Sequence, residues 1–82
     1  MIVVNIKITL DLRIYKKGLF DISVNNEQII NESLKIINES LSLNLNLEQL
    51  SYCKSKREKR AISVYSNFKE NNIYTGDILE FV

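Results

Sequence analysis

The strongest local charge in this 82-residue chain is a short basic segment in its C-terminal half. Its basic residues, interrupted by Glu58, are Lys54, Lys56, Arg57, Lys59 and Arg60. Lysine and arginine at this density can bind an acidic protein surface or phosphate groups. Three interpretations apply: a solvated hairpin loop, a protein contact, or a contact with nucleic acid or a membrane surface. Few aromatic residues are interleaved for base stacking, so we expect no nucleic-acid partner.

The residues that most enzymes use for nucleophilic or metal chemistry are scarce. The chain has no histidine and one cysteine, Cys53, which excludes Ser-His and Cys-His pairs and most zinc sites. Asp11, Asp21 and Asp77 lack the spacing of a metal-binding loop and fit exposed strand and turn positions. We therefore expect no enzymatic activity, no metal and no cofactor.

Cys53 itself has two interpretations. A lone cysteine in a strand is usually a small buried hydrophobe, whereas its neighbours Lys54 and Lys56 could lower the pKa of an exposed thiol and make it reactive. The apolar pattern of this segment allows either face to be buried. We prefer an inward Cys53, because the other choice would turn Lys54 toward the core at a high cost.

The C-terminal segment supplies a second candidate binding surface. If Leu79 and Phe81 are buried, the alternation of side chains along a strand places Ile78, Glu80 and Val82 on the opposite face. Single exposed apolar residues are normal, but a cluster on the open face of a sheet can form a partner-binding patch. Self-association into a weak homodimer is the alternative use of such a patch.

The elements that would position these residues begin with two alternating segments. Over residues 3–13 one face is apolar, and it comprises Val4, Ile6, Ile8, Leu10 and Leu12. In the next segment Phe20, Ile22 and Val24 alternate with Leu19, Asp21 and Ser23. Gly18 lies between the segments and can adopt a positive φ. The pattern predicts an N-terminal β-hairpin.

A change of period from two to about 3.6 predicts a helix over residues 27–41. Asn25, Asn26 and Glu27 supply capping side chains and an early negative charge. The apolar stripe of this helix consists of Ile30, Leu34, Ile37 and Leu41. Residues 42–49 are expected to form an irregular connection with a few buried leucines, because asparagine lowers strand propensity.

Three further strands are expected, over residues 50–56, 61–65 and 78–82, with the charged turn 56–60 between the first two. Phe68 and Ile73 would pack the loop that ends at Gly76 and Asp77. The order describes one domain over residues 1–82, of class α+β, with a mixed sheet of four to five strands packed on one main helix. The last strand can pair parallel to the first because the helix and loops provide a long crossover.

This order resembles the ubiquitin-like β-grasp plan, and two segments are similar to one family within it. Leu10-Asp11-Leu12, Tyr15, Gly18 and Phe20-Asp21-Ile22-Ser23-Val24 resemble the opening of the YukD/EsaB proteins. The ending Asn72-Ile73-Tyr74-Thr75-Gly76-Asp77-Ile78-Leu79 also resembles theirs. The match extends over nearly the whole chain. The chain departs from the family at Cys53 and Ser55, which occupy core positions of the third strand, and in its basic turn.

The resemblance implies a non-catalytic accessory or regulatory protein of Gram-positive type VII secretion systems, whose partners are secretion proteins. Conjugation of ubiquitin needs a flexible tail ending in Gly-Gly, whereas Phe81 and Val82 lie inside the predicted last strand, so we expect no conjugation. The alternatives are a sulfur carrier or protein modifier, and a small nucleic-acid-binding module that uses the turn 54–60.

Charge, hydropathy and cysteine content indicate the cellular compartment of the chain. The formal net charge is +1, so long-range attraction to nucleic acid is not expected. No apolar run approaches the roughly 20 residues that span a bilayer, and the N-terminus does not resemble a signal peptide. A single cysteine suits a reducing compartment. We expect a cytoplasmic protein that does not insert into a membrane.

Overall fold

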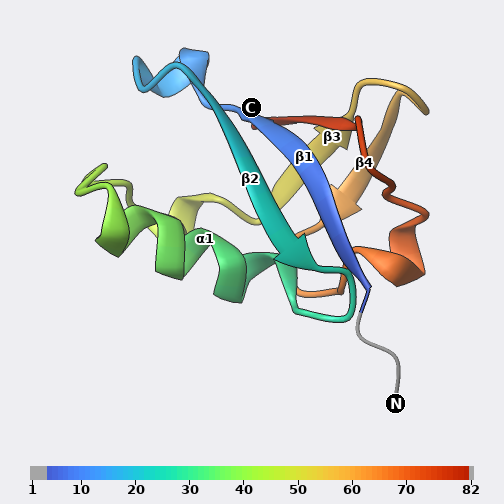
Figure 1. Ribbon diagram of the computed structural model, residues 1–82. Coiled ribbons are helices and arrows are strands. Elements are labelled where there is room, and N and C mark those ends of the chain that lie inside the picture. Colours follow the sequence, from blue (N-terminus) through green and yellow to red (C-terminus); the bar gives the residue numbers. More distant parts are fainter. Residues whose placement is uncertain (1–3, 82) are drawn as a thin grey trace.

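A computed structural model describes residues 4–81 and shows one α-helix packed against one face of a five-stranded sheet (Figure 1). The strands are β1 (Asn5–Asp11), β2 (Leu19–Asn25), β3 (Tyr52–Ser55), β4 (Arg60–Ser63) and β5 (Ile78–Phe81), and the helix is α1 (Ile30–Ser40). Short 3-10 helices are η1 (Arg13–Tyr15), η2 (Leu47–Gln49) and η3 (Lys69–Asn71). The sheet order is β2-β1-β5-β3-β4. The predicted α+β class and mixed sheet are confirmed.

The N-terminal hairpin follows the alternation in the sequence. β1 and β2 pair antiparallel from Asn5 opposite Asn25 to Asp11 opposite Leu19. The even-numbered residues Ile6, Ile8 and Leu10 are buried against the helix side. Gly18 has a φ of 91°, the conformation predicted for this turn. Val4 was expected to be buried but is 45% exposed, because it precedes the first paired residue. Val3, which the same alternation predicts on the outward face, lies outside the described residues.

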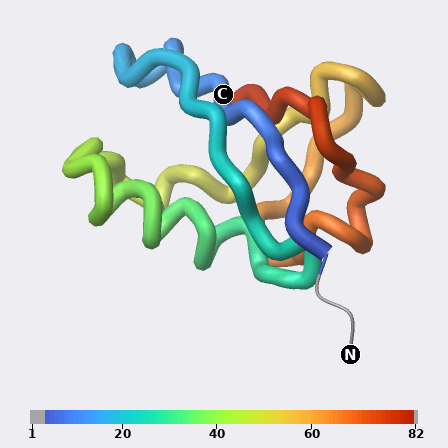
Figure 2. The backbone as a smooth tube through the Cα atoms, in the orientation of Figure 1, coloured from blue at the N-terminus to red at the C-terminus, as the bar shows by residue number. Residues whose placement is uncertain are grey.

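The last strand lies between strands from both ends of the chain. β5 pairs parallel with β1, where Leu10 is opposite Leu79, and antiparallel with β3, where Cys53 is opposite Phe81. Figure 2 shows the red C-terminal segment beside the blue first strand. Leu79 and Phe81 are buried at 0% and 2% exposure. The predicted parallel pairing of the first and last strands is therefore confirmed.

The helix is shorter than predicted at its N-terminus. Asn25 Oδ1 accepts a hydrogen bond from the amide of Glu27 (2.9 Å), so residues 25–28 form a turn and do not cap the helix. α1 has Ile29 as its N-cap, without a capping side chain. Its first amides instead bond to the segment after β4: Ile30 N to Ser66 O (3.0 Å) and Asn31 N to Val64 O (2.7 Å). A tertiary contact thus satisfies the donors that a cap would satisfy.

The apolar stripe of the helix is buried only in its first half. Ile30 and Leu34 are each 1% exposed, and Ile37 is half-buried against the core. Leu41 was predicted to complete the stripe but is 50% exposed, because the helix ends at Ser40 and the chain turns away. Leu43 then enters the core, and Asn38 holds the connection by accepting from Leu45 N (2.8 Å) and donating to Leu45 O (3.3 Å). The irregular connection over residues 42–49 is confirmed in outline.

Candidate protein-binding surface

The basic segment forms the tight turn between β3 and β4. The amide of Lys59 donates to Ser55 O (2.7 Å), and Lys59 has a φ of 56°, in the left-handed region. The amide of Glu58 donates to Ser55 Oγ (3.2 Å). Ser55 is only 2% exposed, so this hydroxyl sets the turn from inside. The turn is a hairpin loop with fixed geometry.

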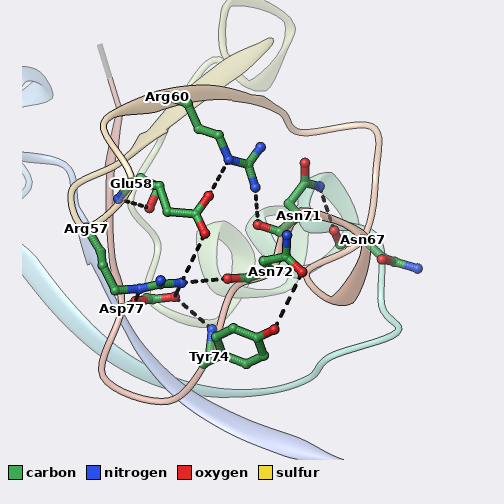
Figure 3. Close-up of polar contacts among 9 residues, drawn as sticks. Arg57, Glu58, Arg60, Asn67, Asn71, Asn72, Tyr74 and Asp77 are labelled. Atoms are coloured by element: carbon green, nitrogen blue, oxygen red, sulfur yellow. Dashed lines mark hydrogen bonds and ion pairs between the residues drawn. The ribbon is translucent and has the colours of Figure 1, made fainter.

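Arg57 points back from the turn to the buried carboxylate of Asp77 (Figure 3). Its Nε lies 2.7 Å from Oδ1 and its Nη2 3.1 Å from Oδ2, a two-point contact. Nη2 also donates to the carbonyl of Asn72 (2.7 Å), and the guanidinium lies 5.5 Å from the ring centroid of Tyr74. The amide of Tyr74 completes the site by donating to Asp77 Oδ2 (2.7 Å). Paired donors of this kind are among the stronger hydrogen bonds in proteins.

These contacts change the protonation of the pair. The Arg57 side chain is the main cause that holds the pKa of Asp77 below its usual value of 3.8, against the opposing effect of burial. The same hydrogen bond raises the pKa of Arg57. Asp77 is therefore a carboxylate at neutral pH, and its charge is neutralised within the fold.

Arg60 makes a second connection between the same two segments. Its guanidinium contacts the Glu58 carboxylate and the carbonyl of Asn71. The side-chain amide of Asn71 donates in turn to Asn67 O and Ser66 Oγ, both at 2.7 Å. We call Arg57, Glu58, Arg60, Asn71 and Asp77 the arginine network. It joins the β3–β4 turn to the loop that leads into β5 (Figure 3).

The basic segment therefore divides into two groups. Arg57 and Arg60 are bound to partners in the fold, each beside a carboxylate. Lys54, Lys56 and Lys59 are exposed, and their ammonium groups form no ion pair with the rest of residues 4–81. The sequence placed all five in one basic surface. The structure leaves the positive charge that a partner can reach mainly on the three lysines.

Two of these lysines share a sheet face with the residues predicted on the last strand. Lys54 is opposite Glu80 in the β3–β5 pairing, and Lys56 N donates to Ile78 O (3.0 Å). Ile78 and Glu80 are half-buried and alternate with the buried Leu79 and Phe81, as predicted. A shallow hollow of about 240 Å³ beside Ile78 is lined by Lys56, Arg57, Gly76, Asp77 and Ile78. Val82, the third predicted residue of this patch, lies outside the described residues.

Tyr52 extends this face, and the sequence analysis did not select it. It lies two residues before Lys54 on β3 and is 61% exposed. Strand periodicity places it on the same side as Lys54. The signal in the sequence was the position of Tyr52 two residues before Lys54, which places both on one face once Cys53 is assigned to the core. We call Tyr52, Lys54, Lys56, Ile78 and Glu80 the open-face surface.

Two of the three aspartates were wrongly expected at exposed positions. Asp11 is 7% and Asp77 4% exposed, while Asp21 is exposed and accepts from the Thr9 hydroxyl (2.6 Å). Asp11 binds the guanidinium of Arg13 through Oδ1 (3.0 Å) and Oδ2 (2.8 Å). That side-chain hydrogen bond is the main cause that lowers the pKa of Asp11. Each of these two aspartates is paired with an arginine, which offsets the cost of shielding its carboxylate from water.

Asp11 and Arg13 also border a hollow at the far end of the open face. This hollow has a volume of about 460 Å³ and is lined by Asp11, Arg13, Ile14, Glu80 and Phe81. It is wide and shallow, and Asp11 and Arg13 in its lining are paired with each other. We treat it as a margin of the open-face surface.

Cys53 faces the core. It is 1% exposed, and burial raises the pKa of its thiol to about 12. The thiolate is the reactive form of cysteine, so the buried interpretation holds and the reactive one does not. Within residues 4–81 there is no group of three or more histidine, cysteine or acidic residues placed to bind a metal ion. No helix in that range is long and apolar enough to cross a membrane.

Comparison with known proteins identifies the fold. No protein-family model matches the chain, and no curated protein matches it in sequence. Among solved structures, a designed protein based on ubiquitin superposes with a TM-score of 0.71 at 19% identity, covering 95% of this chain and 87% of that one. The C-terminal ubiquitin-like domain of mouse tubulin-specific chaperone e superposes with a TM-score of 0.70 at 9% identity, covering 99% and 88%. The chain has the ubiquitin-like fold.

Proposed function

We propose that this protein is a non-catalytic adaptor that recognises a partner protein through its open-face surface. The observation that carries the proposal is that exposed Lys54 and Lys56 lie beside half-buried Ile78 on one face of the sheet: Lys54 is opposite Glu80 in the β3–β5 pairing, and the amide of Lys56 donates to Ile78 O. Lys54 and Lys56 have no ion-pair partner within the described chain, and the hollow beside Ile78 can receive an apolar side chain. Such a surface fits an acidic segment that carries an apolar residue.

The arginine network supports this role because it holds the two segments that border the open-face surface in a fixed position relative to each other. Arg57 and Arg60 bind the loop that leads into β5, so the β3–β4 turn and the start of β5 are held together. A fixed surface loses little conformational entropy on binding. The engaged guanidinium groups also weigh against a phosphate or nucleic-acid partner, since these are the side chains best suited to two-point phosphate contacts.

We propose further that the partner is a component of a type VII secretion system and that binding is non-covalent. The support for this pathway is the resemblance of residues 10–24 and 72–79 to the YukD/EsaB proteins. A bacterial cytoplasmic location follows from that proposal. The fold by itself is shared by proteins with different roles and does not select a pathway.

A titration tests the proposal. The cytosolic domains of the secretion components from the same organism are added one at a time to ¹⁵N-labelled protein, and amide shifts are followed by NMR. We expect one component to shift Lys54, Lys56, Ile78 and Glu80. The double variant Lys54→Glu/Lys56→Glu should weaken that binding by about tenfold at low salt.

Lys35→Glu is the matched control, because Lys35 is an exposed lysine on α1, away from the open face. It should change the affinity by less than about twofold. Binding by none of the components would refute the secretion role. Equal weakening by the control and the double variant would refute the assignment of the surface.

A further inference from the structure

The outer edge of β2 is a second surface that the proposed function does not use. β2 lies at one end of the sheet, paired with β1 on one side (Figure 1). It is seven residues long, and its register with β1 runs without a bulge. Asp21 is its one charged residue, and it contains neither lysine nor proline. Bulges, lysines, prolines and short length are the devices that usually keep such an edge from pairing.

The hydrogen bonds that flank the hairpin show which groups of β2 are free. Asn26 N donates to Val4 O and Leu12 N to Gly18 O, both at 2.9 Å, so the even-numbered residues of β2 bond to β1. In an antiparallel pair the remaining residues direct their main-chain groups away from the neighbour. The N–H and C=O groups of Leu19, Asp21 and Ser23 therefore face the open edge.

We propose that this edge pairs antiparallel with β2 of a second copy of the chain, in a register centred on Ile22. Among two-fold registers, this one pairs all seven residues, from Leu19 opposite Asn25 to Asn25 opposite Leu19. Asp21 and Ser23 of one copy then exchange main-chain hydrogen bonds with Ser23 and Asp21 of the other. A register centred on Asp21 would instead set two aspartates directly opposite each other, which is unfavourable.

Both faces of the joined sheet are complementary in this register. On the core side, half-buried Ile22 meets Ile22 of the second copy, and Phe20 meets Val24. On the open side, Lys7 on β1 is opposite Ser23 on β2 of the same copy. In the proposed register this Ser23 is in turn opposite Asp21 of the second copy, so Lys7, Ser23 and that Asp21 form one row across three strands. Adjacent strands are about 4.8 Å apart, so Lys7 and that Asp21 lie two spacings, about 10 Å, apart, a distance that the extended lysine side chain and the carboxylate can span together. A hollow of about 210 Å³ lies at this position, lined by Lys7, Asp21, Ile22 and Ser23.

The size of the contact sets its strength. One pair of seven-residue strands buries less than the roughly 800 Å² per partner of a standard stable interface. The second copy is therefore expected to bind weakly, with a dimer that accumulates only at high protein concentration, on the order of 0.1–1 mM. The open-face surface is separate from this edge, so the two binding events can be tested independently.

The test uses sedimentation equilibrium over a concentration series, with ¹⁵N NMR to locate the contact. The intact chain should show a monomer–dimer equilibrium, and the amides of Leu19, Asp21 and Ser23 should shift with concentration. Ser23→Asp places like charges opposite each other twice in the dimer and should weaken it by about three- to tenfold. Ser23→Asn places a neutral side chain of the same size as aspartate there and should change the dimer affinity by less than about twofold.

Asp21→Pro provides a structural control for the edge. It removes an N–H group that faces the open edge and leaves the bonds to β1 in place, a position where strands tolerate proline. Its thermal unfolding checks that the variant is folded. The dimer should be lost in this folded variant. A monomer at all concentrations, shifts confined to another surface, or equal effects of Ser23→Asp and Ser23→Asn would each overturn the proposal.

Discussion

Arg57 and Asp77, twenty positions apart in the chain, form a two-point ion pair with Nε–Oδ1 and Nη2–Oδ2 distances of 2.7 and 3.1 Å. The carboxylate is 4% exposed and the guanidinium side chain 48%. One end of the pair thus lies inside the protein and the other in solvent. Because Arg57 also bonds to Asn72 O, this contact ties the β3–β4 turn to the entry of β5.

Asp77→Asn should lower the free energy of unfolding by about 1–2 kcal/mol. The amide keeps the shape but loses the charge that Arg57 faces, and solvent at the guanidinium limits the loss relative to a fully buried pair. Urea denaturation at pH 7 measures the change. Glu39→Gln is the control, since Glu39 is an exposed helix residue, and it should shift the free energy by less than about 0.5 kcal/mol. Equal effects of the two variants would show that the ion pair is not stabilising.

Stability should fall in acid because of the same carboxylate. The pKa of Asp77 is held below 3.8 by Arg57, so the folded chain binds this proton more weakly than the unfolded chain. The contribution is therefore complete above the unfolded pKa and is lost as the pH falls through the folded pKa. Asp11, whose pKa is lowered by Arg13, acts in the same direction.

Urea denaturation between pH 7 and pH 2 tests this sign. The free energy of unfolding should be nearly constant down to about pH 5 and then decline. In Asp77→Asn the decline should be shallower, with the part that remains due to Asp11 and other carboxylates. A variant that loses stability in acid as steeply as the parent chain would contradict the assignment.

Leu79→Ala should destabilise the fold by about 2–5 kcal/mol through lost burial and the cavity left behind. Leu79 is 0% exposed on β5, between Leu10 of β1 and Ser55 of β3. Thermal unfolding followed by circular dichroism measures the effect. Ile36→Ala removes a similar side chain from a helix position that is 54% exposed and should cost less than about 0.5 kcal/mol. A small effect at Leu79 would mean that β5 is not central to the core.

Cys53 should resist thiol reagents in the folded protein. Its thiol is buried, and burial raises its pKa to about 12, so the reactive thiolate is rare at neutral pH. Reaction with a disulfide reagent at pH 7.5 should be at least about a hundredfold slower than in urea, where the thiol is exposed and its pKa is ordinary. Reaction at the denatured rate in buffer alone would place Cys53 at the surface.

The sequence predicted the elements whose patterns are local. The alternation of residues 4–12 and 19–24 and the helical period after residue 29 are visible without tertiary information, and so is the buried pair Leu79 and Phe81. The helix start was misplaced because the amides of Ile30 and Asn31 bond to residues 66 and 64, which propensity alone does not reveal. The last turn was over-extended because Leu41 fits the stripe but follows the final helical residue.

The low exposure of Asp11 and Asp77 could not be predicted from the alternation of residues along the strands. Asp77 looks like an exposed turn residue, and only the fold brings Arg57, twenty positions away, to its carboxylate. Asp11 looks like an exposed strand residue; its partner Arg13 is only two positions away, but the alternation of the strand does not reveal their contact. The contact with Asp77 engages Arg57, and contacts with Glu58 and Asn71 engage Arg60, so two arginines of the predicted basic surface are bound within the fold. The lysines were placed correctly on exposed positions, because strand parity fixes Lys54 once Cys53 is assigned to the core.

Site-specific photocrosslinking in living cells shows whether a partner protein binds the open-face surface. A benzophenone amino acid replaces Lys56 in one strain and Lys35 in another, and covalent products are identified by mass spectrometry after illumination. We expect one defined product from position 56, containing a type VII secretion component, and none of that product from position 35. No product at position 56, or the same product from both positions, would contradict it.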